Sequence, residues 1–130
     1  MQAAPGIGVD LIEIGRLERA LERRPGLLER IFTAGEIEAS EMRQRPARHL
    51  AARFAAKEAA LKCLGIGGLR LHEVEVLGGG REPPRLRLHG AAAEAARRSG
   101  VDLSVSLSHS QDLATAVVLA STAQSRSSAE

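Results

Sequence analysis

Two acidic side chains and one lysine are the residues best suited to carry chemistry. Asp10 follows the run Gly6-Ile-Gly-Val, whose bare backbone lets a ligand come near. Glu58 and Lys62 stand four positions apart, so they share one face of any helix that contains them. Two carboxylates are ligands that Mg²⁺ accepts when phosphates and water complete its octahedron, and a lysine one turn later could contact those phosphates.

Each of these residues also has a simpler structural interpretation. Asp10 could cap a helix or pair with an arginine, because an unpaired buried charge is strongly destabilising. Glu58 and Lys62 could form an exposed ion pair that contributes about 0.3 to 0.5 kcal/mol. Spacing alone does not choose between a metal and phosphate site and these structural roles.

Other polar groups are candidates for ligand or partner contact. His109 lies between two serines at a predicted turn, but the sequence has no Gly-x-Ser-x-Gly elbow, which disfavours a serine hydrolase and favours phosphate contact or capping. Arg16, Arg19 and Arg23 share one face of a predicted helix. Such a row is either a solvated face or a docking surface for an acidic partner helix.

The spacing of apolar residues predicts the helices and strands that must position these residues, and glycine and proline mark where those elements end. The patterns predict a strand that begins at residue 6 and ends near residues 10–12, helices at 13–24, 33–43, 47–64 and 90–98, and strands at 72–77, 86–88, 101–108 and 113–120. Thr33 and Glu36 form a capping box at the start of the second helix. This order predicts one α+β domain over residues 1–120, with helices packed on an antiparallel or mixed sheet, and a disordered tail at 121–130.

The helix predicted at 47–64 has an unusual distribution of charge. Three apolar residues form a narrow stripe, and charged residues border it on both sides: Leu50, Phe54 and Leu61 in the stripe, Arg53 and Lys57 on one side, Glu58 and Lys62 on the other. The remaining positions are mostly alanine. Either the Arg and Lys stems pass the edge of an ordinary core, or the helix is packed on two sides with its charges in a polar cleft. The pattern alone slightly favours the first interpretation.

Composition excludes several classes of protein. The 130 residues are 44% hydrophobic and 26% charged, which is typical of a folded soluble domain. No apolar run approaches the roughly 18 to 20 residues of a membrane span, so we expect a cytoplasmic protein without membrane contact. A net charge of +2 and 2% aromatic residues argue against nucleic acid as a partner. Cys63 is the only cysteine, so no intrachain disulfide forms.

Three motifs together resemble the holo-[acyl-carrier-protein] synthase family, the small bacterial 4′-phosphopantetheinyl transferases. They are Gly6-Ile-Gly-Val-Asp10-Leu-Ile-Glu-Ile, Arg53-Phe-Ala-Ala-Lys-Glu-Ala-Ala-Leu-Lys62 followed by Leu64-Gly65, and Val105-Ser-Leu-Ser-His-Ser110. The motifs occur in the order and spacing of the family, and the resemblance spans residues 6–120. The fold implied is that of a 4′-phosphopantetheinyl transferase.

The resemblance implies transfer of phosphopantetheine from coenzyme A to a serine of apo acyl carrier protein, with release of adenosine 3′,5′-bisphosphate, in fatty acid biosynthesis. It implies Asp10 and Glu58 as Mg²⁺ ligands, Glu58 and Lys62 as catalytic groups, and a homotrimer with active sites between subunits. The sequence leaves open whether Glu58 itself or a metal-bound water takes the serine proton. Residues that match the family's coenzyme A site are Arg53, Lys62, Gly65, Gly67 and His109. An acidic carrier protein makes Arg16, Arg19 and Arg23 the expected docking residues.

Two departures and one alternative accompany this resemblance. Ile66 replaces the threonine that the family commonly has between the two glycines, so a hydroxyl contact is absent there. Cys63 replaces a small residue and is expected to pack as a small hydrophobe. The alternative function is a non-catalytic oligomeric module that binds a nucleotide or an acidic protein without turnover.

Overall fold

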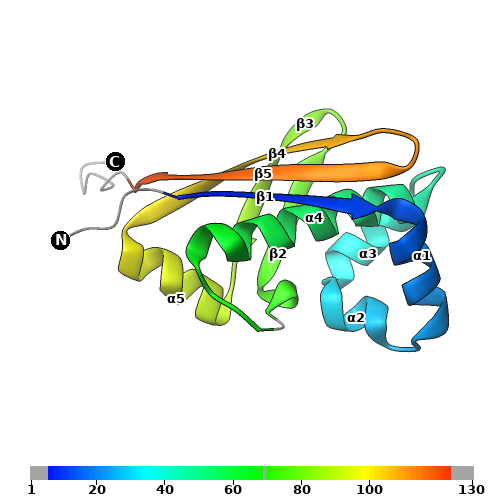
Figure 1. Cartoon of the computed structure of the whole chain (residues 1–130), viewed down its shortest axis with the longest axis horizontal. Coiled ribbons are helices and arrows are strands. Elements are labelled where there is room, and N and C mark those ends of the chain that lie inside the picture. Colours follow the sequence, from blue (N-terminus) through cyan, green and yellow to red (C-terminus); the bar gives the residue numbers. More distant parts are fainter. Residues whose placement is uncertain (1–5, 69, 124–130) are drawn as a thin grey trace.

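The computed structural model describes residues 6–68 and 70–123, and Figure 1 labels their helices and strands. In chain order these are β1 (Ile7–Glu13), α1 (Ile14–Arg23), α2 (Leu27–Ile31), α3 (Ala34–Glu41), α4 (Pro46–Leu64), the 3-10 turn η1 (Leu71–Glu73), β2 (Val74–Gly79), β3 (Glu82–Leu88), α5 (Gly90–Ser99), β4 (Val101–His109) and β5 (Leu113–Thr122). Within these two ranges, no helix has the length and apolar character to span a bilayer.

The strands form two separate antiparallel sheets. One has the order β1-β5-β4, with Asp10 opposite Ala116 and His109 opposite Ala114, and the other is the β2-β3 hairpin. The α+β class predicted from the sequence is confirmed. The mixed-sheet alternative is wrong for the described strands, because every pair runs antiparallel.

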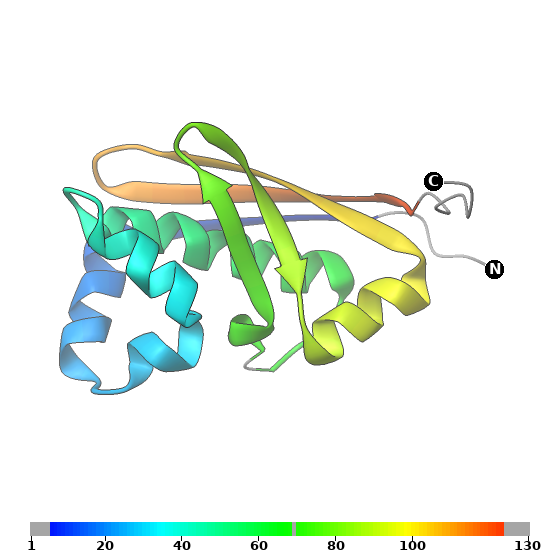
Figure 2. The same ribbon diagram turned by 180° about the vertical axis from the view of Figure 1, so that it is seen from behind.

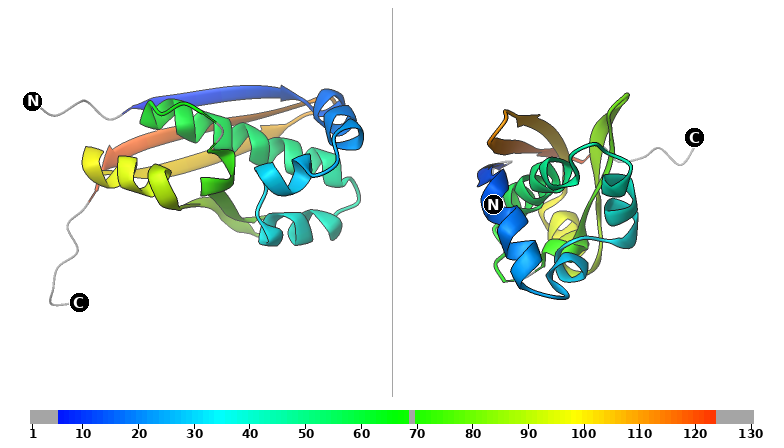
Figure 3. Two further views of the ribbon diagram at one scale, coloured as in Figure 1. Left: turned by 90° about the horizontal axis from the view of Figure 1, so that it is seen from below. Right: turned by 90° about the vertical axis from the view of Figure 1, so that its right-hand side faces the viewer.

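Helix α4 lies at the centre of the molecule and is packed on more than one side. It contacts the three-stranded sheet on one face and α1, α3 and β2 elsewhere (Figures 2 and 3). Its many alanines let these elements approach closely. Lys57 is 0% exposed and Arg53 is 4% exposed. The interpretation of α4 as a helix at an ordinary core edge is therefore wrong, and packing on two sides is correct.

The burial of Lys57 is stabilised by a complete set of polar partners. Its Nζ donates to Glu36 Oε1 at 2.6 Å and to the carbonyl oxygens of Leu71 at 3.1 Å and Val74 at 2.6 Å. Glu36 Oε2 accepts a hydrogen bond from the Val76 amide at 2.8 Å. Buried charges are tolerated when they are paired and fully hydrogen-bonded. This network joins α3, α4 and β2.

A glycine sets the distance between β1 and α4. A Cβ atom built on Gly8 would lie 1.9 Å from the carbonyl oxygen of Ala59, which is backbone and cannot move aside. Asp10 lies two residues later and therefore on the same face of β1, whereas Ile7, Val9 and Leu11 are exposed on the other face. The close approach at Gly8 thus turns Asp10 toward α4.

Several elements differ from the sequence-based expectation. Strand β1 continues to Glu13, past its expected end near residues 10–12, and β3 begins at Glu82, four residues before its expected start. Helix α2 was not predicted, because five residues after Pro25-Gly26 are too few to show a helical period. The strand expected from residue 72 begins at Val74, since η1 occupies the preceding residues. Strand β5 extends to Thr122, which pairs with Val101, two residues past the expected end of the domain. The rest of the expected tail, from residue 124, lies outside the described residues.

Candidate active site

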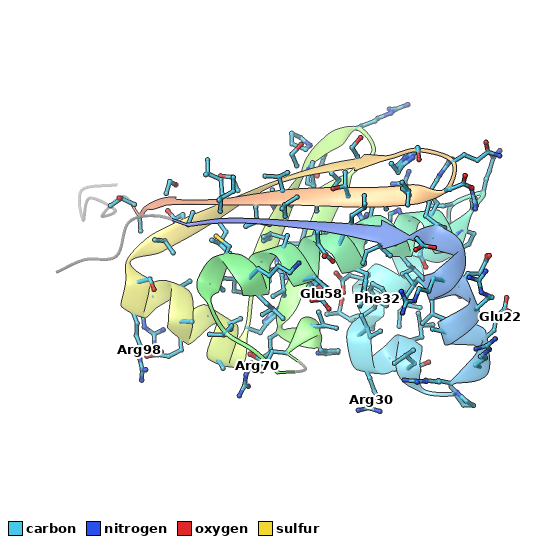
Figure 4. All side chains as sticks on the ribbon, viewed as in Figure 1. Glu22, Arg30, Phe32, Glu58, Arg70 and Arg98 are labelled. Atoms are coloured by element: carbon cyan, nitrogen blue, oxygen red, sulfur yellow. The ribbon has the colours of Figure 1, made fainter. Side chains whose placement is uncertain are left out.

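Strand β1 and helix α4 bring Asp10, Glu58 and Lys62 together, and we call these three residues the acid–lysine cluster. Lys62 Nζ lies 3.0 Å from Asp10 Oδ1 and donates a longer hydrogen bond, at 3.3 Å, to the Val9 carbonyl. Glu58 projects from α4 one turn before Lys62 (Figure 4). The tertiary fold therefore brings together a strand residue and two helix residues that are far apart in the sequence.

Glu58 lies within electrostatic range of both Asp10 and Lys62. Burial raises the pKa of the Glu58 carboxyl above its usual range, and the charge of Asp10 raises it further, while Lys62 acts in the opposite direction. Within residues 6–68 and 70–123, Glu58 makes no salt bridge. The carboxylate of Glu58 thus carries an incompletely compensated negative charge beside a second acid.

This donor set fits a divalent cation that is shared with a substrate. Mg²⁺ in proteins is commonly held by one or two carboxylates, with substrate phosphates and water as the remaining ligands. Among the described residues there is no group of three or more His, Cys, Asp or Glu side chains that could form an all-protein metal site. Asp10 and Glu58 match the sparser pattern that Mg²⁺ uses.

The glycines after α4 lie directly beyond the lysine. Gly65 ends the helix with φ +70°, a conformation that L side chains rarely adopt, and its N–H donates to the Lys62 carbonyl at 3.1 Å. Gly67 follows and is exposed. Ile66 and Cys63 pack against the edge of the core, as expected for Cys63. The turn therefore leaves bare backbone next to the acid–lysine cluster.

A second polar region, which we call the arginine cleft, has a volume of about 1000 Å³. Its basic lining residues are Arg43, Arg45, Arg48, His49, Arg53, Arg81 and His109. The cleft thus contains two predicted site residues, Arg53 and His109. Positions 53 and 62 are nine residues apart on α4, which places them about 180° apart around the helix. One chain therefore directs Arg53 and Lys62 to opposite faces of α4.

Arg53 is a buried cation with little local compensation. Its Nη2 donates to the Gly78 carbonyl at 2.6 Å, and its Nε has no hydrogen-bond partner in the described structure. The nearby acid, Glu36, is already paired with Lys57. Burial lowers the pKa of the Arg53 guanidinium. An anionic ligand would supply the missing negative charge.

Most residues of the arginine cleft were not singled out in the sequence. Arg43 and Arg45 lie in the connection between α3 and α4, Arg48 lies in the first turn of α4, and Arg81 lies in the β2-β3 turn. The density of arginine between positions 43 and 53 is a usable signal for an anion site. Arg81 carries no such signal, because only the folded hairpin places it beside α4.

His49 is a neutral group within this basic cleft. Burial, followed by the charges of Arg53 and Arg43, lowers the pKa of His49 to about 4. In the unfolded chain this histidine has its ordinary pKa of about 6.5. As the pH falls from about 6.5 toward 4, protonation at His49 therefore favours the unfolded state.

We expect the variant His49→Phe to lose less thermal stability than the parent protein on acidification. The melting temperature of the variant minus that of the parent protein should increase by several degrees between pH 7 and pH 4.5, because phenylalanine has no proton to bind. Differential scanning fluorimetry across this range measures the gap. Since His72 is exposed, His72→Phe is the matched control and should give parallel curves. A constant gap for His49→Phe would contradict the assignment.

The predicted docking arginines lie on α1 and do not line the arginine cleft. Arg16, Arg19 and Arg23 are exposed on α1, while Ile14 and Leu17 of the same helix face the core. Among the described residues, none of the three forms a salt bridge. Their charges are therefore available to an external partner.

Comparison with known proteins settles the family. The family model described as the 4′-phosphopantetheinyl transferase superfamily matches residues 6–118. The chain belongs to this family. A holo-[acyl-carrier-protein] synthase from Moorella thermoacetica is 50% identical over 117 residues, which cover 86% of this chain and 90% of that protein. Membership in this transferase family confirms the resemblance and the prediction of an enzyme, and it argues against the non-catalytic module.

Solved structures of transferases in the family share the fold. The Chronobacterium ammoniagenes ACPS-CoA complex matches with a TM-score of 0.82 at 30% identity, covering 94% of this chain and 100% of that chain. A holo-(acyl-carrier-protein) synthase from Bacillus anthracis in complex with CoA (3′,5′-ADP) has a TM-score of 0.75 at 31% identity, covering 92% and 100%. These matches confirm the predicted fold class.

Proposed function

We propose that this enzyme transfers 4′-phosphopantetheine from coenzyme A to a serine hydroxyl of apo acyl carrier protein and releases adenosine 3′,5′-bisphosphate, in a Mg²⁺-dependent reaction that serves fatty acid biosynthesis in the cytoplasm. The observation that carries the proposal is the acid–lysine cluster, in a chain of the transferase family. Two similar structures are described as coenzyme A complexes, which supports coenzyme A as the donor.

The chemistry of phosphoryl transfer suits this cluster. Such reactions depend mainly on positioning and on neutralisation of charge at the phosphate oxygens. Asp10 and Glu58 would hold Mg²⁺, which supplies positive charge to the diphosphate when it is bound. The Lys62 ammonium would contact diphosphate oxygens. We propose Glu58 also as the group that accepts the proton of the attacking serine hydroxyl.

The arginine cleft supports a site for the remaining phosphates and the nucleotide. Arg53 and His109 line it, whereas Gly65 and Gly67 follow Lys62 just beyond the end of α4. Because these regions face apart in one chain, we propose that the cleft of one copy meets the acid–lysine cluster of the next. The active site would then lie between subunits.

An exposed apolar surface on the three-stranded sheet supports assembly. Five side chains on the outer face of β1 and β5 are between 40% and 67% exposed: Ile7, Val9, Leu11, Val117 and Leu119. The strand register places Ile7 opposite Leu119 and Val9 opposite Val117, so the patch is continuous. Continuous apolar patches mark interaction surfaces. We propose that a homotrimer, the typical assembly of the family, covers this face.

Mass spectrometry of an apo acyl carrier protein tests the proposed function. Incubation with this enzyme, coenzyme A and Mg²⁺ should add one phosphopantetheine group to the carrier protein and release adenosine 3′,5′-bisphosphate. Chelation of the metal with EDTA should stop the reaction, and excess Mg²⁺ should restore it. A carrier protein of unchanged mass under all conditions would refute the proposal.

We also propose that Arg16, Arg19 and Arg23 dock the acidic carrier protein. The double variant Arg16→Glu/Arg23→Glu should raise the KM for carrier protein about tenfold at low ionic strength and leave kcat nearly unchanged, because exposed charges act mainly on encounter. Added salt should shrink the difference. Steady-state kinetics at two salt concentrations measures both effects. The control Arg97→Glu/Arg98→Glu changes the same charge on α5, and an equal KM change in the control would contradict specific docking.

A further inference from the structure

In the structure, the Lys62 ammonium forms an ion pair with the Asp10 carboxylate. Its Nζ lies 3.0 Å from Asp10 Oδ1 and 3.3 Å from the Val9 carbonyl oxygen, so one ammonium contacts both the side chain and the backbone of β1. The Asp10 side chain is 16% exposed, whereas the Lys62 side chain is 56% exposed. The acid is thus anchored in the fold, while the lysine reaches it from the solvent side.

A divalent cation on this acid pair would have to share Asp10 with the lysine. Asp10 and Glu58 together carry two negative charges, and Lys62 neutralises one of them. A cation that binds both carboxylates would come close to the Lys62 ammonium, and like charges at short range repel. The ammonium and the cation therefore compete for the same carboxylate.

The side chain of Lys62 is free to leave. It stands in the last turn of α4, and more than half of its surface is in contact with solvent. An exposed ion pair of this kind is weak, because the charges are screened and the long side chain loses conformational entropy when it is held. Release of Asp10 needs only a change of lysine rotamer, without movement of the backbone.

We propose that Lys62 and the divalent cation compete for Asp10, so that loading of the cation displaces the Lys62 ammonium and frees it for an anionic substrate. This inference rests on the proposed function and deepens it. Lys62 would then have two opposed effects: it weakens cation binding to the free enzyme and strengthens transfer once the cation is bound. A lysine that only contacts phosphate would leave cation affinity in the free enzyme unchanged.

Titration of the substrate-free protein with Mn²⁺, with unbound Mn²⁺ measured by electron paramagnetic resonance, tests the proposal. At low ionic strength, Lys62→Met should bind Mn²⁺ about three- to tenfold more tightly than the parent protein, because a competing charge is lost. The same variant should transfer phosphopantetheine more slowly. Lys62→Arg keeps the charge and should restore Mn²⁺ affinity to near the parent value.

Arg70→Met is the matched control for net charge. Arg70 is exposed, pairs with Glu73, and points away from the body of the molecule in Figure 4. This variant should change Mn²⁺ affinity less than about twofold, since distant exposed charges are screened. Unchanged or weaker Mn²⁺ binding by Lys62→Met, or no binding by either protein, would overturn the competition. The carrier-protein mass assay on the parent enzyme separately decides whether the proposed function holds.

Discussion

Asp10→Asn and Glu58→Gln should each lower kcat for phosphopantetheine transfer by about 10²- to 10³-fold, the usual cost of removing one preorganised electrostatic group. Both substitutions keep the size of the side chain and remove its negative charge. Asp10 is also the partner of Lys62, so Asp10→Asn loses an ion pair as well as a proposed metal ligand. Mass spectrometry of carrier protein over time measures the rate.

Two comparisons make this result specific to the acid–lysine cluster. Glu22→Gln changes an exposed acid on α1, which lies at the edge of the molecule in Figure 4, and should retain normal kcat. The double variant should be little slower than the slower single variant, because groups that act as a unit are not additive. Full activity in either single variant would remove that acid from the proposed site.

Gly8→Ala should reduce transfer by about a hundredfold, although residue 8 carries no functional group. The new Cβ would meet the Ala59 carbonyl oxygen at 1.9 Å, and neither backbone can yield without moving β1 away from α4. A displacement of about 1 Å at reacting groups can cost about 10²-fold in rate. Overpacking of this kind should also lower the free energy of unfolding by about 1 to 3 kcal/mol.

Gly35→Ala is the matched control for Gly8→Ala. A Cβ on Gly35 would meet Glu75 Oε2 at 3.6 Å, which is ordinary contact, and Gly35 lies inside α3, where alanine is the better helix former. This variant should keep its activity and gain slightly in stability. Circular dichroism must show that Gly8→Ala is folded at the assay temperature. A folded Gly8→Ala enzyme with normal kcat would show that the contact does not position Asp10.

Much of the secondary structure could be predicted because its signals are local. The Thr33 and Glu36 capping box forms as expected, and α4 starts at Pro46 and ends before Gly65. Period-two alternation correctly placed β4. The short helix α2 was not predicted, because a helix of about one turn has too few residues to show a helical period. The division of the strands into two sheets was not predicted either, because strand pairing joins residues that are distant in the sequence.

The candidate site was only partly predictable. The spacing of Glu58 and Lys62 placed them on one helix face, and the run before Asp10 pointed to a bare strand. The roles of these residues still depend on the family resemblance and on the experiments above. Arg43, Arg81 and His49 were not singled out, because no spacing along the chain predicts that a hairpin turn will close over the start of α4.

By itself, the sequence determined the order of the strands and of every helix except α2, the capping box before α3 and the end of α4 at Gly65, because these signals depend on neighbouring residues. It also carried the three motifs of the transferase family. Only the tertiary structure decided that Lys57 is buried against Glu36, that Gly8 brings Asp10 to Lys62, and that α4 separates Arg53 from the acid–lysine cluster. Those outcomes depend on which surfaces pack together, and packing depends on shape and charge across the whole chain.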